Sequence, residues 1–139
     1  MKYLLDTNVV SEFRKPQPNA ALIAWVAQVN PATAYLSVIT IGELQKGIAR
    51  LVDESRRTTL QTWLEEDLLV RFSNQIVTLD TDVLLVWGCL LAQLEKIGRT
   101  MPVMDSLIAA TALHGGFVLV TRNTADFAAA GVQMLNPWQ

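Results

Sequence analysis

"YLLDTNVVSE", residues 3–12, is the stretch on which the interpretation of this chain depends. Three apolar residues lead directly into Asp6, and Val9 and Val10 follow shortly afterwards. An apolar strand of this kind is typical of a parallel sheet that is buried on both faces. Such sheets hold their sites beyond the carboxyl ends of the strands, which is where Asp6 stands. The question is whether Asp6 only caps the next helix or also takes part in chemistry.

The rest of the chain continues this alternation of short apolar runs and longer periodic segments. Strands and helices in alternation indicate a parallel sheet with helices on both faces, and 139 residues are enough for one domain, residues 1–139. We expect strands at 2–6, 34–36, 76–79, 117–121 and 132–135. We expect helices at 8–15, 20–29, 38–51, 55–72, 82–97, 104–114 and 124–130.

The composition limits the class of protein and its location. Hydrophobic residues make up 51% of the chain, which suggests apolar surface reserved for a protein partner. The longest uncharged apolar run, residues 83–92, is about half of the ~20 residues that a membrane-spanning helix needs. Cys89 is the only cysteine, so no internal disulfide can form, and the N-terminus does not resemble a signal peptide. We therefore expect a cytoplasmic protein without a membrane segment.

Three acidic residues and one amide are candidates for a site. Asp6 and Asn123 follow expected strands, Glu43 lies within an expected helix, and Asp105 opens another. Each has a plain structural alternative. Asp6 can cap a helix, although Thr7 or Asn8 is the better candidate for the cap. Glu43 can be an ordinary surface glutamate, and Asp105 can be a first-turn acid that the helix dipole favours.

Taken together, these oxygen ligands favour a metal site over the alternatives. His114 is the only histidine, so neither a histidine-rich zinc site nor a histidine-based triad is well supported. Clusters of carboxylates select hard ions such as Mg²⁺ or Mn²⁺. These ions bridge phosphate oxygens and activate water, which points to a metal-dependent phosphoester hydrolase. The net charge of −2 does not exclude a nucleic-acid substrate, because a phosphate-binding surface can be local.

Four segments in order resemble the PIN-domain nucleases, and most of all the toxins of VapBC-type toxin–antitoxin pairs, including the FitB-like branch. They are "LLDTNVVSE" (4–12), "LSVITIGELQKGI" (36–48), "MDSLIAATAL" (104–113) and "LVTRNTADF" (119–127). The closing "NPW" (136–138) is also similar to that branch. The resemblance implies a Rossmann-like three-layer α/β/α sandwich with a mostly parallel sheet. It also implies a Mg²⁺- or Mn²⁺-dependent endoribonuclease.

The resemblance also implies roles for individual residues. Asp6, Glu43 and Asp105 match the acidic metal-binding positions of the family. Asn123 stands where the family often has a fourth acid, so an amide oxygen, or else the carboxylate of Asp126, would complete the site. The hydroxyls of Thr7 and Thr121 are expected to support the carboxylates. In the resulting mechanism Asp6 and Asp105 hold the metal, and Glu43 completes the pocket and orients the attacking water.

Partners follow from the same resemblance. It implies an RNA substrate, a homodimer, and a cognate antitoxin whose C-terminal segment covers a hydrophobic groove and the acidic site. It further implies a larger toxin–antitoxin assembly that binds DNA through the antitoxin. The candidates for holding RNA are Arg14, Lys15, Lys46, Arg50 and Arg122. The candidates for antitoxin contact are Leu22, Trp25, Val26, Trp63 and Leu64, unless they are core residues.

Two other classes of protein remain open from the sequence. A haloacid dehalogenase-like phosphatase also begins with a strand that ends in aspartate, but it normally has a second aspartate two positions later. Here that position is Asn8, which weakens the phosphatase interpretation. The second alternative is a PIN-like binding module without catalysis, which the amide at Asn123 keeps open.

Overall fold

The computed structural model describes residues 1–139 and contains a five-stranded sheet in which every pairing is parallel. The strands are β1 (Lys2–Leu5), β2 (Ala34–Ser37), β3 (Ile76–Val77), β4 (Phe117–Val120) and β5 (Met134–Leu135). Their order across the sheet is β3-β2-β1-β4-β5. The chain therefore builds outwards in one direction from β1 and then crosses back, which puts the topological switch point between β1 and β4.

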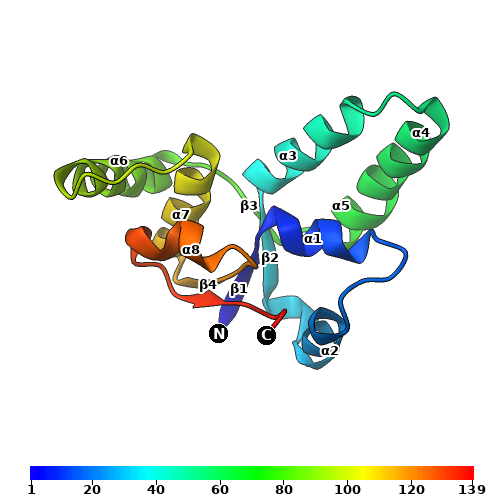
Figure 1. Ribbon diagram of the computed structural model, residues 1–139, viewed down its shortest axis with the longest axis horizontal. Helices are drawn as coiled ribbons and strands as arrows, with labels where there is room; N and C mark the ends of the chain where they lie inside the picture. Colours follow the sequence, from blue (N-terminus) through cyan, green and yellow to red (C-terminus); the bar gives the residue numbers. More distant parts are fainter.

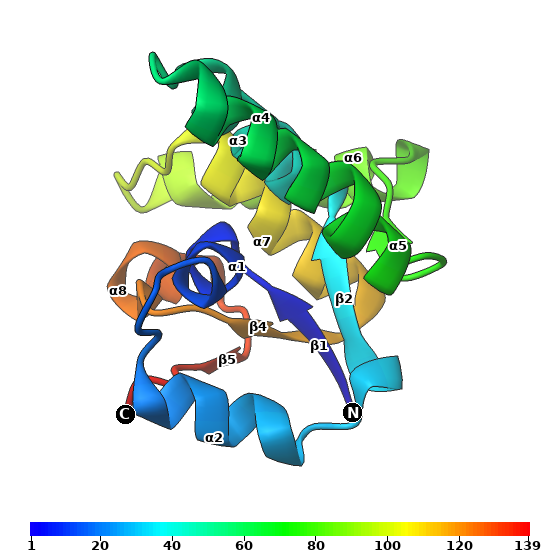
Figure 2. The same ribbon diagram turned by 90° about the vertical axis from the view of Figure 1, so that its right-hand side faces the viewer.

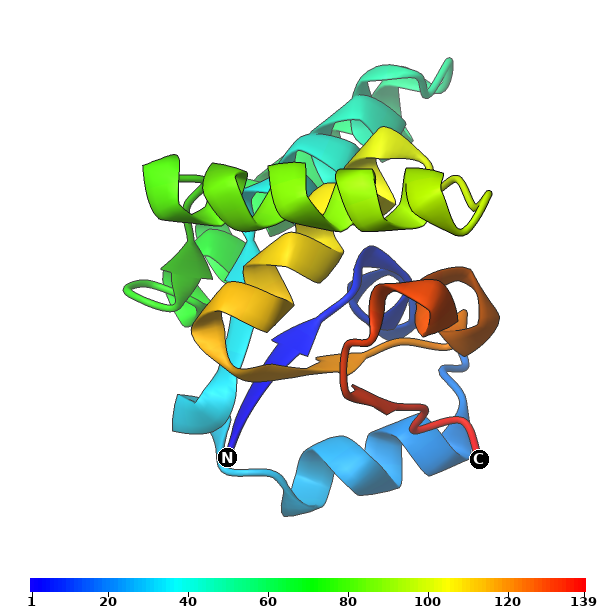
Figure 3. The ribbon, with the colours of Figure 1, turned by 90° about the vertical axis from the view of Figure 1, so that its left-hand side faces the viewer.

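Helices cover both faces of this sheet, as Figure 1 shows in one view and Figures 2 and 3 show from either side. One layer contains α1 (Thr7–Phe13), α2 (Ala20–Gln28), α3 (Val38–Ala49), α4 (Glu54–Thr62) and α5 (Leu69–Arg71). The other contains α6 (Thr81–Lys96), α7 (Val103–Gly115) and α8 (Thr124–Phe127). Short helical turns lie at η1 (Pro31–Thr33), η2 (Trp63–Leu68) and η3 (Ala128–Ala130). The expected three-layer α/β/α sandwich is confirmed.

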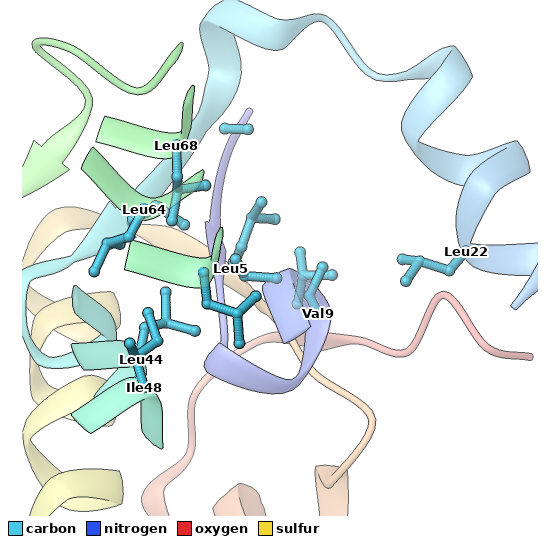
Figure 4. Close-up of a cluster of buried hydrophobic side chains, with 12 residues drawn as sticks. Leu5, Val9, Leu22, Leu44, Ile48, Leu64 and Leu68 are labelled. Atoms are coloured by element: carbon cyan, nitrogen blue, oxygen red, sulfur yellow. The ribbon is translucent and has the colours of Figure 1, made fainter. Parts of the chain in front are cut away.

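Each face of the sheet has its own hydrophobic core, because successive strand residues point to opposite sides. Leu5 and Val120 belong to the core on the α1–α5 side, whereas their neighbours Leu4 and Leu119 belong to the core on the α6–α8 side. Figure 4 shows the first core, in which Leu5 of β1 lies between side chains from α1, α3 and η2. These strands are buried on both faces, as their near-continuous apolar sequence predicts.

Most expected helices form within a few residues of the predicted bounds, but one cap differs from the prediction. The N-cap of α1 is Asp6 itself, whose carboxylate accepts a hydrogen bond from the Thr7 N–H. Thr7 or Asn8 was the expected cap. Asp6 belongs to both elements: its backbone is extended and its N–H pairs with the Val120 carbonyl, while its own carbonyl accepts from the Val9 N–H in the first turn of α1.

The expected single helix over residues 55–72 is instead α4, the π-helical segment η2 and α5 in succession. A π turn adds one residue per turn and depends on tertiary packing, so the apolar spacing of the sequence does not reveal it. The expected strands 76–79 and 132–135 are shorter, at Ile76–Val77 and Met134–Leu135, because each pairs on one side only at the edge of the sheet. No helix in this fold is long and apolar enough to cross a bilayer.

Candidate active site

Asp6 is the first residue beyond β1, at the switch point of the sheet. In the register of the β1–β4 pair Leu5 lies opposite Val120, so Asp6 and Thr121 leave the sheet side by side. The Asp6 side chain is only 6% exposed. Its Oδ1 accepts from the Thr7 backbone N–H at 2.8 Å, and its Oδ2 accepts from the Thr121 hydroxyl at 2.8 Å. One carboxylate therefore caps α1 and also faces the carboxyl edge of the sheet.

Thr121 is fully buried and connects three elements of the site. While it donates to Asp6, its hydroxyl accepts from the Asn8 side-chain amide at 3.2 Å and from the Asn123 backbone N–H at 3.0 Å. Asn8 also donates to Asp6 Oδ2 at 3.3 Å. The supporting part of Asn8 was missed from the sequence, where this residue served only as a candidate cap and as evidence against a phosphatase. No sequence signal distinguishes an amide that caps from one that orients a carboxylate.

Glu43 enters the site from α3. This helix begins after β2 because the Ser37 side chain accepts from the Ile39 N–H, and Glu43 then lies on the second turn. The Thr7 hydroxyl donates to Glu43 Oε1 at 2.7 Å and also lies 3.1 Å from the Thr40 hydroxyl. Thr7 and Thr121 thus both place hydroxyls against carboxylates, one against Glu43 and the other against Asp6.

Asp105 enters from the opposite layer, in the first turn of α7, which contacts α3. Its side chain is half-buried, yet it takes part in no hydrogen bond and no ion pair within the chain. Both of its carboxylate oxygens are therefore free to accept from, or coordinate, something outside the protein.

The acids of the site influence one another electrostatically. Burial is the main cause that raises the pKa of Asp6, the hydrogen bonds from Thr121 and Thr7 oppose it, and the negative charges of Glu43 and Asp126 raise it further. Burial likewise raises the pKa of Asp105, followed by the charges of Asp6, Glu43 and Asp126. No lysine or arginine forms an ion pair with any of these carboxylates, because the two ion pairs of the chain lie elsewhere.

The two candidates for the fourth ligand differ in their placement. Asn123 occupies the N-cap position of α8, but its exposed side chain makes no capping hydrogen bond, and only its backbone contacts the site through Thr121. Asp126 is also exposed, yet its charge raises the pKa of both Asp6 and Asp105. The charge of Asp126 thus acts on both carboxylates, and the backbone of Asn123 is bonded to Thr121 beside them, so either side chain can supply the fourth ligand.

The donor set suits a hard divalent cation. It offers carboxylate oxygens alone, the type of ligand that Mg²⁺ and Mn²⁺ prefer. Two of its members, Asp6 and Asp105, have raised pKa values, and the positive charge of a bound cation would lower them again. The acids are not drawn tightly together in the protein alone: the ligand atoms that all lie within 4.8 Å of one another belong to the exposed Asp80, Asp82 and His114. Asp80 already caps α6 through the Val83 N–H, so that cluster has a structural explanation.

The basic candidates fall into three groups: Arg14 and Arg122 lie over tryptophan rings, Lys15 is in an ion pair, and Lys46 and Arg50 are exposed without one. The Arg14 guanidinium lies 4.4 Å from the centroid of Trp63 and lines a cavity of about 260 Å³ together with Glu43. Lys15 is paired with the buried Glu12 at 2.9 Å, which leaves it less available for RNA than the sequence suggested. Arg122 lies over Trp138 at 5.3 Å. Lys46 and Arg50 are exposed at the end of α3, away from any ion pair.

An apolar groove of about 530 Å³ opens between α1, α2 and the η2–α5 segment. Three of the five candidates for protein contact line it, namely Trp25, Val26 and Trp63. The other two, Leu22 and Leu64, are 0% and 2% exposed and belong to the core. The core alternative is therefore confirmed for these two, because both side chains point into the hydrophobic core on the α1–α5 side of the sheet.

Comparison with known proteins places the chain in a family. A family model described as the PIN domain matches residues 3–132. The chain is 39% identical to a VapC ribonuclease, Y4jK, of Sinorhizobium fredii over 98% of its length and 97% of the relative's. It is 36% identical to the toxin FitB of Neisseria gonorrhoeae, covering 97% of each. A solved structure of FitAB bound to the IR36 DNA fragment has a TM-score of 0.92 at 34% identity, over 99% of this chain and 96% of that one.

The chain therefore belongs to the PIN-domain family. This membership overturns the haloacid dehalogenase-like alternative, and the structure supplies a physical reason. Asn8, at the position where that phosphatase class normally has its acid/base, is engaged with Asp6 and Thr121 through its side-chain amide. An amide held in this way can neither accept nor donate a catalytic proton.

Proposed function

We propose that this chain, as a single PIN domain over residues 1–139, is a metal-dependent endoribonuclease that acts as the toxin of a type II toxin–antitoxin pair. The observation that carries the proposal is a set of four carboxylates, from Asp6, Glu43, Asp105 and Asp126, at the switch point of a parallel sheet, with no protein cation among them. Such an arrangement costs stability and is retained at functional sites. The ribonuclease and toxin names of the full-length relatives support the same activity.

In this proposal Asp6 and Asp105 hold Mg²⁺ or Mn²⁺, with Glu43 and Asp126 completing the negative pocket. The ion would neutralise the scissile phosphate and lower the pKa of an attacking water. Thr121 and Asn8 both donate to Asp6 Oδ2 and fix the rotamer of this side chain, whereas Oδ1 accepts only from the Thr7 N–H and keeps a lone pair for the ion. Thr7 holds Glu43 Oε1, which leaves Oε2 free to accept a proton or orient the water.

Partners follow from the groove and from the relatives. The apolar groove, defined by Trp25, Val26 and Trp63, fits an amphipathic segment of an antitoxin, which would also reach the acidic site. The solved structure of FitAB contains a bound DNA fragment. In our proposal the antitoxin partner of this chain would likewise bind DNA, and the toxin would be held on the DNA through the antitoxin. We further propose that the protein acts as a homodimer in the cytoplasm.

The test is cleavage of total RNA in vitro with Mg²⁺, comparing wild type with Asp6→Asn, each purified free of host nucleases. The proposal predicts Mg²⁺-dependent fragments from the wild type, and none from the variant, whose circular dichroism spectrum is unchanged. Equal cleavage by both proteins would assign the activity to a contaminant or to another site. A wild type that binds its antitoxin but never cleaves RNA would favour the binding module without catalysis.

A further inference from the structure

Two arginines face a cavity that continues from the acidic pocket, and neither has a carboxylate partner. This cavity, of about 260 Å³, lies between α1, α3 and α4. Thr7 and Glu43, which belong to the acidic pocket, line one part of it, and Arg14 and Arg56 line another. The two ion pairs of the chain involve neither arginine, and no side-chain hydrogen bond occupies either guanidinium. Arg56 was not among the basic candidates selected from the sequence.

The two guanidiniums are close enough to repel each other. The pKa of Arg14 is lowered first by burial and then by the charge of Arg56. Arg14 is held in place by Trp63, whose ring centroid lies 4.4 Å from the guanidinium carbon. A stacked, preorganised arginine beside a second one presents two planar donor sets, which is the arrangement that binds a phosphate bidentately. An anion between them would remove the repulsion.

Gly47, one turn after Glu43 on α3, also lines this cavity. A Cβ built at Gly47 meets no atom within 4 Å, so nothing in the protein fills this space. Glycine in the middle of a helix lowers its stability relative to other residues. A longer side chain at Gly47 would extend into the open space beside the cavity.

Resting on the proposed ribonuclease function, we propose that Arg14 and Arg56 form a subsite for a second backbone phosphate of the RNA strand whose scissile phosphate lies in the acidic pocket. The acidic pocket repels a polyanion, so a substrate needs nearby positive charge to remain bound. The cavity supplies it next to Glu43, in a chain whose net charge of −2 offers no general attraction. Phosphate contacts of this kind position the strand without reading its sequence.

The test measures binding separately from cleavage. A fluorescent 12-nucleotide single-stranded RNA is titrated with protein in EDTA, at several salt concentrations, and the anisotropy gives Kd. Arg56→Gln is expected to weaken binding about three- to tenfold, since it removes one charge-assisted contact at an exposed site. The slope of log Kd against log salt should fall by about 0.7, the value for one lost phosphate contact on a single strand.

Two further variants separate the subsite from general effects. Lys2→Gln removes a positive charge at the amino end of β1, the opposite edge of the sheet, and should change neither Kd nor the slope. Gly47→Gln places a side chain beside the cavity and should weaken RNA binding. Its thermal unfolding temperature should rise, because glutamine favours a helix over glycine, which rules out loss of folding as the cause. Arg14 is not used alone as a test because its loss also removes the contact with Trp63.

Each result decides the proposal. Wild-type affinity and slope in Arg56→Gln would overturn the subsite, while Asp6-dependent cleavage by the same preparation would leave the proposed function standing. A wild-type protein that neither cleaves nor binds RNA would overturn both. If a fluorescent hexaglutamate peptide binds the wild type and is lost in Arg56→Gln, while RNA binding is unchanged, the cavity takes carboxylates of a protein partner and the RNA subsite is wrong.

Discussion

Replacing Thr121 with valine should destabilise the metal-free protein, and more so at high pH than at low pH. Valine keeps the shape of the side chain and removes only the hydroxyl, which donates to Asp6 Oδ2 at 2.8 Å and accepts from Asn8 and Asn123. Thr121 is 0% exposed and Asp6 is 6% exposed, so water cannot simply replace the lost donor.

The magnitude follows from the type of hydrogen bond that is lost. When Asp6 is ionised, the lost bond is charge-assisted and buried, and we expect a cost of about 2–3 kcal/mol. When Asp6 is protonated, a neutral bond is lost, and the cost falls to about 1 kcal/mol. The direction is set by the pKa of Asp6, which burial raises and the Thr121 hydrogen bond lowers. Without that bond the pKa of Asp6 in the folded protein rises further. The extra cost of Thr121→Val is therefore present when the pH lies above the pKa of Asp6, and it disappears as the pH falls through that pKa.

The assay is urea denaturation in EDTA at pH 8 and at pH 4, with the free energy of unfolding compared between wild type and variant. Thr111→Val is the matched control, because Thr111 is also buried but its hydroxyl donates to the Leu107 carbonyl of its own helix, far from any carboxylate of the site. The control should cost about 1 kcal/mol at both pH values. Equal costs for Thr121→Val at the two pH values would refute the assigned contact between hydroxyl and carboxylate.

Three further predictions concern the acids and the core. Since burial and neighbouring acids raise the pKa of Asp105, Asp105→Asn should stabilise the metal-free protein at pH 8, and this gain should vanish at pH 4; urea denaturation checks it, and a loss of stability at pH 8 would contradict it. Asp126→Asn should weaken Mn²⁺ binding about tenfold in calorimetry, whereas Asn123→Ala should change it less than about twofold; the reverse ranking would make Asn123 the ligand. Leu64→Ala should cost about 3 kcal/mol of unfolding free energy and Val26→Ala, in the groove, under about 1.5, and similar costs would show that Leu64 is not a core residue.

The parallel sheet and the position of the site could be predicted from the sequence because both depend on local patterns. The apolar run before Asp6 and the apolar strand before Thr121 identify two buried strands, and the switch-point rule places their ends at a site. Asp105 stands out as the only charge between Arg99 and Arg122. These signals lie in composition and spacing, so they need no knowledge of the packing.

The features that were missed depend on contacts between distant segments. The part played by Asn8 becomes visible only when β4 brings Thr121 next to it, and the π turn at η2 has buried residues, Leu64 and Leu68, whose packing the sequence does not specify. Leu22 and Leu64 are apolar residues of helical segments, as Trp25 is. Spacing in the sequence alone does not show that the first two point into the core while Trp25 lines the groove. Arg56 lies in the charged helix α4 next to Arg57, and the sequence gives no reason to choose between the two arginines. Only its place in the lining of the cavity distinguishes Arg56.

The central claim is that the carboxylates at this edge of the sheet hold the divalent ion that RNA cleavage requires. The most direct measurement is the rate of cleavage of a fluorogenic single-stranded RNA across a Mg²⁺ titration, comparing wild type with Asp105→Asn. The Asp105 side chain makes no hydrogen bond or ion pair within the chain, so its replacement changes the site and leaves the fold intact. The account predicts saturable Mg²⁺-dependent cleavage by the wild type and at least about a hundredfold slower cleavage by a fully folded Asp105→Asn. Wild-type rates in that variant, at any Mg²⁺ concentration, would contradict it.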